Sequence, residues 1–158
     1  MGNMKNFDYF DTLLLSPAEM KKRQLRRGWA LSNIGFIVYA LLRIFVKPKE
    51  YRGICPYFEI GNGGSGVSFG WFFVCGRSAS ESTKMHEVGH CIQNAAVGGI
   101  RMLFFSMLSV ARYWKRAIFV SKTNYDDWWF EGQATRIGRS YVKTLQMECK
   151  ENKKNGTH

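Results

Sequence analysis

The segment Met85–Cys91 (MHEVGHC) constrains this chain more than any other, because it holds two of the three histidines four residues apart. On an α-helix, residues at this spacing lie one turn apart on the same face, so His86 and His90 can reach a single tetrahedral ion. Glu87 lies between them, where a carboxylate can take a proton from a metal-bound water. The segment therefore predicts a metal-binding helix with two histidine ligands and a glutamate general base. The alternative is a helix that carries two histidines by chance.

The surrounding residues independently predict a helix from about Ser80 to Val97. Residues 78–82 (SASES) hold a capping-box pattern and three N-cap candidates, and two glycines at 98–99 end the run. His86 and His90 fall on one stripe of this helix, and apolar residues form a separate stripe that suits a protein core.

Two histidines leave a zinc ion short of ligands, so a third protein ligand is required. The metzincin motif needs glycine and histidine where this chain has Gln93 and Ala96, which excludes that class. Glu131 is the best remaining candidate and Asp127 the second, because Glu131 opens another helical pattern that runs to about Cys149. A glutamate in a first helical turn can also serve only to complement the helix dipole.

Small residues indicate how Glu131 could approach the histidines. The second helical pattern carries a stripe of mostly small side chains, namely Glu131, Ala134 or Thr135, Gly138 and Val142. Gly89 offers a matching notch between the two histidines. Because small side chains let two helices approach closely, we expect the metal where this notch meets the stripe.

Three sequence blocks resemble a known family. Residues 83–94 (TKMHEVGHCIQN), 109–114 (SVARYW) and 127–135 (DWWFEGQAT) are similar to small, largely uncharacterised bacterial and phage proteins described as zincin-like metallopeptidases of the gluzincin type. The resemblance spans about residues 55 to 142. It implies a metal bound by His86, His90 and Glu131 and Glu87 as general base, but it does not imply a known substrate. The predicted chemistry is Zn²⁺-dependent hydrolysis of a peptide or related amide bond, so a peptide or protein substrate is expected. The resemblance also implies that the strand before the active-site helix pairs with an extended substrate, a role that residues 67–74 would fill. The alternative is that these residues form an ordinary hydrophobic strand of the sheet.

Amide hydrolysis also needs a donor for the oxyanion that forms near the metal. Tyr113, Arg112 and Tyr125 lie between the two predicted metal-binding helices and are candidates, although each could equally pack or face solvent. Gln93 is a further candidate, either to support the ligands or, in a closed structural site, to bind the metal itself.

The whole pattern predicts an α+β fold of the minimal zincin type, mostly helical, with a short β-hairpin or small sheet before the histidine helix. Residues 57–60 and 67–74 are the expected strands, joined by a glycine-rich turn. The turn sequence GNGGSG matches the dinucleotide fingerprint, but a strand pattern follows it where that fingerprint needs a helix, so nucleotide binding is not expected.

The four cysteines at 55, 75, 91 and 149 contain no C-x-x-C pair, which argues against a zinc ribbon or finger. Cys91 projects away from the histidine stripe and is expected to be a small core residue. Cys55 and Cys75 flank the glycine-rich segment and could form a disulfide.

A formal net charge of +11 favours an anionic partner, and a basic cluster at 21–27 precedes the apolar run Trp29–Val46. This run predicts either a membrane-associated helix or a core helix. No cleavage site follows it, so a removed signal peptide is not expected, and the location is either at a membrane or in the cytoplasm. A second apolar run at 98–111 is expected to be a buried hairpin or an interfacial segment, because a crossing there would separate His90 from Glu131.

The expected organisation is a basic N-terminal segment at 1–28, a hydrophobic helix at 29–46, a zincin-like catalytic domain at 47–147 and a disordered tail at 148–158. The rival to an enzyme is a non-catalytic basic module that binds a membrane or nucleic acid and holds a structural metal or none. Nucleic acid is the less favoured partner because no recognised motif for it occurs.

Overall fold

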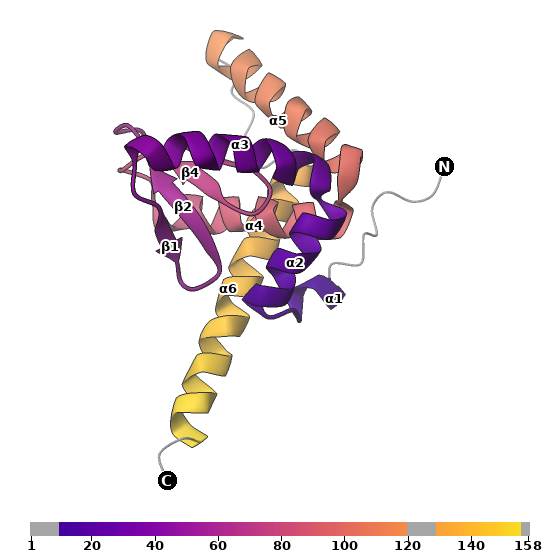
Figure 1. Cartoon of the computed structure of the whole chain (residues 1–158), viewed down its shortest axis with the longest axis vertical. Helices are drawn as coiled ribbons and strands as arrows, with labels where there is room; N and C mark the ends of the chain where they lie inside the picture. Colours follow the sequence, from indigo (N-terminus) through magenta and orange to yellow (C-terminus); the bar gives the residue numbers. More distant parts are fainter. Residues whose placement is uncertain (1–9, 120–128, 156–158) are drawn as a thin grey trace.

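The computed structural model describes residues 10–119 and 129–155 (Figure 1). The N-terminal helices are α1 (Phe10–Leu13), α2 (Pro17–Arg27) and α3 (Trp29–Phe45). The strands β1 (Lys49–Tyr51), β2 (Cys55–Glu59), β3 (Gly66–Ser68) and β4 (Phe73–Cys75) follow. The chain then forms α4 (Glu81–Val97), α5 (Gly99–Phe119) and α6 (Trp129–Asn155). The predicted α+β class, mostly helical with a small sheet, is confirmed.

Helix α2, which carries the basic cluster at 21–27, packs into the fold. Helix α2 starts at a capping box, in which the Ser16 hydroxyl accepts from the Glu19 amide and the Glu19 carboxylate accepts from the Ser16 amide. Its buried side contributes Met20 to the core, and the Gln24 side chain donates a hydrogen bond of 3.0 Å to the Cys91 carbonyl of α4. The basic residues of α2 therefore sit on a helix that is fixed to the centre of the molecule.

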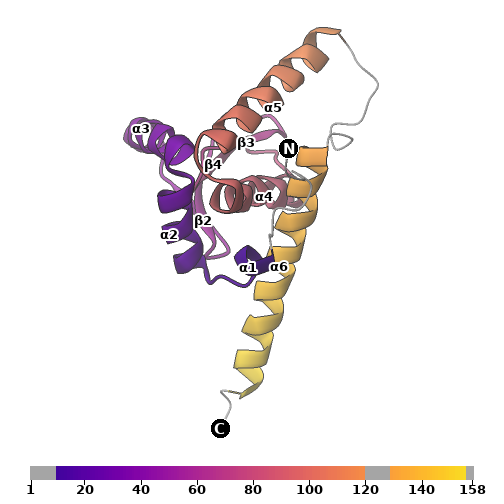
Figure 2. The same cartoon turned by 90° about the vertical axis from the view of Figure 1, so that its right-hand side faces the viewer.

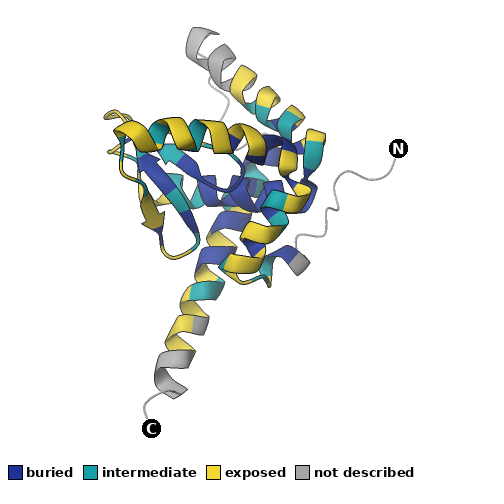
Figure 3. Ribbon diagram, viewed as in Figure 1, coloured by how far each residue is buried: buried dark blue, intermediate teal, exposed yellow. Residues whose placement is uncertain are grey.

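Helix α3 is exposed along most of its outer side and is covered by the protein only on its inner side (Figure 3). Its inner side packs on the aromatic cluster of Phe58, Trp71 and Phe72, to which Tyr39 contributes ring contacts of 4.7 to 5.3 Å. Within the part of the chain that the structure describes, no single helix is long and apolar enough to span a membrane. Helices α2 and α3 meet that requirement only as a pair, and they are bent by 106° where they join.

The sheet has the strand order β1-β2-β4-β3. Strands β2 and β4 are parallel, whereas β1 pairs with β2 and β3 pairs with β4 in antiparallel register. The prediction of one strand over residues 67–74 was therefore wrong. Gly70 adopts a φ of 83°, and the Phe69 amide donates to the Phe72 carbonyl, so a tight turn divides the apolar run into two strands.

Helix α4 runs through the middle of the molecule, between the sheet and α6 (Figures 1 and 2). Its bounds confirm the predicted helix. Of the three candidate caps it is Ser80 whose hydroxyl accepts from the Thr83 amide, at 3.1 Å. Every residue from Glu87 to Val97 is buried, so the second half of the histidine helix is surrounded by protein.

Helices α4 and α6 cross at the glycines that the sequence singled out. A Cβ atom on Gly89 would lie 1.9 Å from the Ala134 carbonyl oxygen, and one on Gly138 would lie 1.9 Å from the Met85 carbonyl oxygen. Any side chain at either position would push the two helices apart. The predicted contact between the Gly89 notch and the small-residue face is confirmed.

Three further predictions concern residues 98–111, the C-terminal tail and the cysteines. Of the two alternatives for 98–111, the buried hairpin was wrong, because these residues belong to the continuous helix α5, which no glycine or proline interrupts after Gly99. The interfacial segment stays a prediction. The predicted disordered tail is helical as far as Asn155, because α6 continues through good helix formers until Gly156. All four cysteines are free thiols, and Cys91 is buried as expected.

Candidate metal centre

Helices α4 and α6 bring His86, His90 and Glu131 together. The Nε2 atoms of the two histidines lie 3.1 Å apart. The Glu131 Oε2 atom lies 3.1 Å from Nε2 of His86 and 3.0 Å from Nε2 of His90. The three atoms thus form a nearly equilateral triangle, which comes from residues 45 and 41 positions apart in the chain.

This triangle has the dimensions of a metal site. Zinc–ligand distances of about 2.0–2.1 Å at tetrahedral angles separate neighbouring ligand atoms by roughly 3.3 Å. Among the described residues, these three side chains form a group that could hold a metal ion. Two imidazole lone pairs and a carboxylate oxygen would repel one another at 3.1 Å unless a cation or a proton lay between them.

The hydrogen bond on the far side of His90 fixes the ring in the form that binds metals. Its Nδ1 atom lies 2.8 Å from Gln93 Oε1, and the Gln93 amide nitrogen donates to the Phe130 carbonyl at 3.0 Å. Because the amide group is oriented by that second bond, its oxygen must accept from Nδ1–H of His90. In the neutral ring the lone pair of His90 is then on Nε2, the atom that forms one corner of the triangle.

His86 is held in the same way from the other helix. Its Nδ1 atom lies 2.8 Å from the Thr135 hydroxyl oxygen, and that hydroxyl donates to the Glu131 carbonyl at 3.3 Å. With its proton engaged there, the hydroxyl oxygen accepts from Nδ1–H of His86. Both histidines therefore present Nε2 lone pairs to the same point.

Glu131 is fully buried and is held at both oxygens. Oε2 faces the histidines, while Oε1 accepts a hydrogen bond of 2.5 Å from the Ser109 hydroxyl of α5. Burial alone would raise the pKa of Glu131, but the adjacent His86 and His90 rings and the hydrogen bond from Ser109 hold that pKa far below its ordinary value. Burial lowers the pKa of His90, whereas the bond and charge of Glu131 outweigh this and raise it. The carboxylate is therefore ionised inside the protein.

Glu87 lies on the turn between the histidines and is also buried, at 4% exposed. Its Oε2 atom has no hydrogen-bond partner among the described residues. Burial raises the pKa of this carboxyl, although the neighbouring His90 and His86 oppose the shift. Gly66 of β3 makes room for it, since a Cβ atom there would lie 2.7 Å from Glu87 Cγ. A buried carboxylate with an unused oxygen beside metal ligands has the properties of a general base.

The structure brings together most of the residues predicted from the sequence. His86, His90 and Glu131 converge, and Gln93 supports His90 instead of facing the triangle. The candidates Tyr125 and Asp127 lie outside the described residues. Arg112 and Tyr113 belong to α5, but their side chains are outside the described part.

Ser109 and Thr135 were not predicted as supports for the ligands. Thr135 follows Glu131 by one helical turn, a spacing that could have indicated a shared role. Ser109 lies 22 residues from Glu131, and no local pattern connects the two.

No family model, curated protein or solved structure matches this chain. Its function is therefore inferred from the residues and geometry of the metal centre.

Proposed function

We propose that this protein is a zinc-dependent hydrolase of peptide or related amide bonds. The observation that carries the proposal is the His86, His90 and Glu131 triangle together with the buried, incompletely bonded carboxylate of Glu87 on the same helix. The three side chains of the triangle would bind the metal, and Glu87 has the position and environment of a general base.

Zinc is favoured by the ligand set. Two imidazoles and one carboxylate form a donor set of catalytic zinc sites, which keep a fourth position for water or substrate. Gln93 is excluded as a fourth ligand because its oxygen is engaged by His90 and its nitrogen by the Phe130 carbonyl. This supports an open catalytic site over a structural site closed by Gln93.

The chain's own residues would divide the chemistry as follows. Bound Zn²⁺ would polarise the scissile carbonyl and acidify a water molecule. Glu87 accepts the proton of the attacking water at its unused oxygen and then delivers it to the leaving amine. Gln93, Thr135 and Ser109 hold the three ligands in place through the bonds described above, so that little reorganisation is needed during the reaction.

An extended peptide is the substrate that the neighbouring sheet fits best. Strand β3 is at the edge of the described sheet, paired only with β4, and Gly66 in it contacts the Glu87 side chain. A peptide added to this edge as a further strand would pass beside the metal ligands. Main-chain pairing would then hold the peptide with little dependence on its sequence.

The test compares metal content and peptide cleavage in four proteins. We expect about one zinc per wild-type chain and little zinc in His86→Ala/His90→Ala. Glu87→Gln should keep its zinc and lose cleavage of a casein or mixed-peptide substrate by about 10²-fold or more, which is the usual size of a general-base contribution. Glu81→Gln, an exposed change on the same helix, is the matched control and should cleave like the wild type.

Two results would overturn the proposal. Equal zinc in the wild type and the double histidine variant would remove the metal site. Equal cleavage by the wild type and Glu87→Gln would remove the base.

A further inference from the structure

Helix α3 carries large apolar residues on its exposed side as well as on its covered inner side, and Asn33 and Arg43 are its exposed polar residues. Its outer side exposes six large apolar residues after Trp29, and four of them are 56 to 83% exposed. They are Ile34, Phe36, Ile37, Leu41, Ile44 and Phe45. A surface helix of a globular protein normally carries polar residues on the side that faces solvent. An apolar face of this size marks an interaction surface.

Helix α5 extends this surface. Its described half exposes Ile100, Phe104, Met107, Leu108 and Val110, of which the first, second and fourth repeat at the four-residue spacing of one helical face. Helices α3 and α5 are in contact, and both lie on the outside of the molecule (Figures 2 and 3). We call these eleven residues and Trp29 the apolar face.

Cations surround the apolar face. No aspartate or glutamate occurs between Met20 and Lys49 or between Val88 and Tyr125, so α3 and α5 carry no acidic residue. Arg43 and Lys47 lie at the C-terminal end of α3, and Arg101 lies on α5, all three exposed. The Lys21 ammonium lies 5.3 Å from the Trp71 ring, which itself contacts Phe36 of the apolar face at 5.2 Å.

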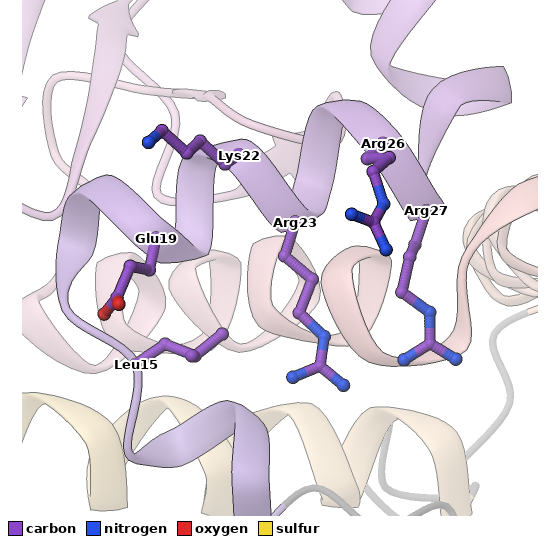
Figure 4. A pocket seen from close by; sticks show the side chains of 6 residues that line it. All are labelled: Leu15, Glu19, Lys22, Arg23, Arg26 and Arg27. Carbon is purple, nitrogen blue, oxygen red and sulfur yellow. The ribbon is translucent and has the colours of Figure 1, made fainter.

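Helix α2 carries more cations, and its C-terminal end lies where α3 and α5 begin. The Arg27 carbonyl lies against Gly98 at the start of α5, and Trp29 lies beside Gly99. Lys22, Arg23, Arg26 and Arg27 line an open hollow with Leu15 and Glu19, and the guanidinium groups of Arg23 and Arg27 extend in the same direction (Figure 4). Glu19, the only acid there, is engaged by the Ser16 cap.

We propose that the apolar face docks on the surface of an anionic lipid bilayer, with the α2 cations contacting lipid phosphates. Apolar side chains beside cations, without intervening acids, match the acyl and headgroup layers of such a membrane. A second copy of the chain would oppose cations with cations, which disfavours a symmetric dimer through this face. Because the inner side of α3 packs on Phe58 and Phe72, the helix would lie in the plane of the membrane.

The test is co-sedimentation of the full chain with vesicles of phosphatidylcholine alone or with 30% phosphatidylglycerol. We expect binding to the anionic vesicles and little to the neutral ones. Ile37→Ser/Ile44→Ser should weaken binding about tenfold or more, because two exposed side chains lose their burial in lipid. Lys22→Gln and Arg26→Gln should each weaken it about fivefold, as expected for one basic residue near an anionic surface.

Matched controls lie on α6, away from the apolar face. Met147→Ser and Lys143→Gln, both at exposed positions, should bind like the wild type. Glu87→Gln should also bind like the wild type, which keeps this result separate from the proposed hydrolase activity. Circular dichroism checks that each variant is folded.

Two outcomes would overturn the proposal. One is that the wild-type protein stays in solution in the presence of anionic vesicles. If that protein also forms dimers that Ile37→Ser/Ile44→Ser dissociates, the face binds a second copy of the chain and not lipid. The other is unchanged vesicle binding by Ile37→Ser/Ile44→Ser.

Discussion

The metal centre and the apolar face break the usual distribution of side chains in opposite ways. At the metal centre, ionisable groups are buried, and nearly all of them are held by hydrogen bonds from neighbouring helices. On the apolar face, large hydrophobic side chains are exposed and no part of the described chain covers them. Each departure costs free energy in the isolated chain, and each would be relieved by a different ligand, a cation in one case and lipid in the other.

The two regions also differ in how closely their side chains must fit. The metal centre lies on the α4–α6 crossing, where two glycines allow backbone contact and three side chains are positioned within 3.1 Å. The apolar face depends on no such fit, because burial in lipid scales with area and not with direction. We therefore expect substitutions at the α4–α6 crossing to change stability or zinc affinity strongly, and substitutions on the apolar face to change stability only slightly.

The largest effect is expected from Gly138→Ala. The added methyl group would meet the Met85 carbonyl at 1.9 Å, so α4 and α6 must separate, at a cost of about 3 kcal/mol or more in the free energy of unfolding. Urea denaturation measures this. Gly64→Ala, where the nearest atom lies at 3.7 Å, is the control and should change stability by less than about 1 kcal/mol. A tolerated Gly138→Ala would mean that the helices do not pack this closely.

Glu131→Ala should abolish stoichiometric zinc binding. It removes the carboxylate oxygen 3.0 to 3.1 Å from both histidine nitrogens and leaves two ligands. We expect zinc affinity to fall by more than the roughly 10- to 100-fold typical of supporting residues. A competition titration with a zinc chelator measures the change, with Glu151→Ala on the same helix as control. Unchanged affinity would exclude Glu131 as a ligand.

Ser109→Ala and Thr135→Val should each weaken zinc binding by about 10- to 100-fold while all three ligands remain. Ser109 holds the outer oxygen of Glu131, and Thr135 fixes the tautomer of His86. The same chelator titration applies, and Ser106→Ala, one turn before Ser109 on α5, serves as the control. If neither variant changed the affinity, the hydrogen bonds would not contribute to positioning the ligands.

On the apolar face, Ile44→Ser should leave stability within about 0.5 kcal/mol of the wild type, because an exposed side chain loses little on substitution. Phe58 is fully buried in the aromatic cluster beneath α3, so Phe58→Ser should destabilise the protein by about 3 kcal/mol or more. Thermal unfolding of the two variants measures the contrast. Strong destabilisation by Ile44→Ser would show that the face is covered by the protein itself.

The smallest effect is expected at the start of α4. The Glu81 carboxylate accepts from the Tyr51 hydroxyl at 2.6 Å and pairs with Arg52, and these contacts lower its pKa. A lowered pKa means that the carboxylate stabilises the fold above its unfolded pKa of about 4.3 and that this contribution is lost as the pH falls through the folded pKa. Glu81→Gln should therefore lose less than about 1 kcal/mol at pH 7, and the difference from the wild type should shrink as the pH is lowered toward 3. Unfolding curves at the two pH values test this.

Local features of the sequence determined the histidine helix and most of the candidate site. A four-residue spacing places His86 and His90 on one face wherever a helix forms, and a serine cap with terminal glycines defines that helix. The helix bounds, the buried Cys91 and the Gly89 contact with the small-residue face were predictable for this reason. Glu131 was also found, because few acidic residues follow the histidines and only one begins a helix with a small-residue stripe.

Only the tertiary structure decided the features that depend on residues distant in the chain. The turn at Gly70 split a continuous apolar run into β3 and β4, and the pairing of β2 with β4 set their parallel direction. The bonds from Gln93, Thr135 and Ser109 position the ligands, although Ser109 shows no local signal in the sequence. Hydrophobic periodicity identified α3 as apolar, but it could not say that one side is covered and the other exposed. Periodicity reports how apolar side chains are arranged on one element, whereas their burial depends on which other elements pack against it.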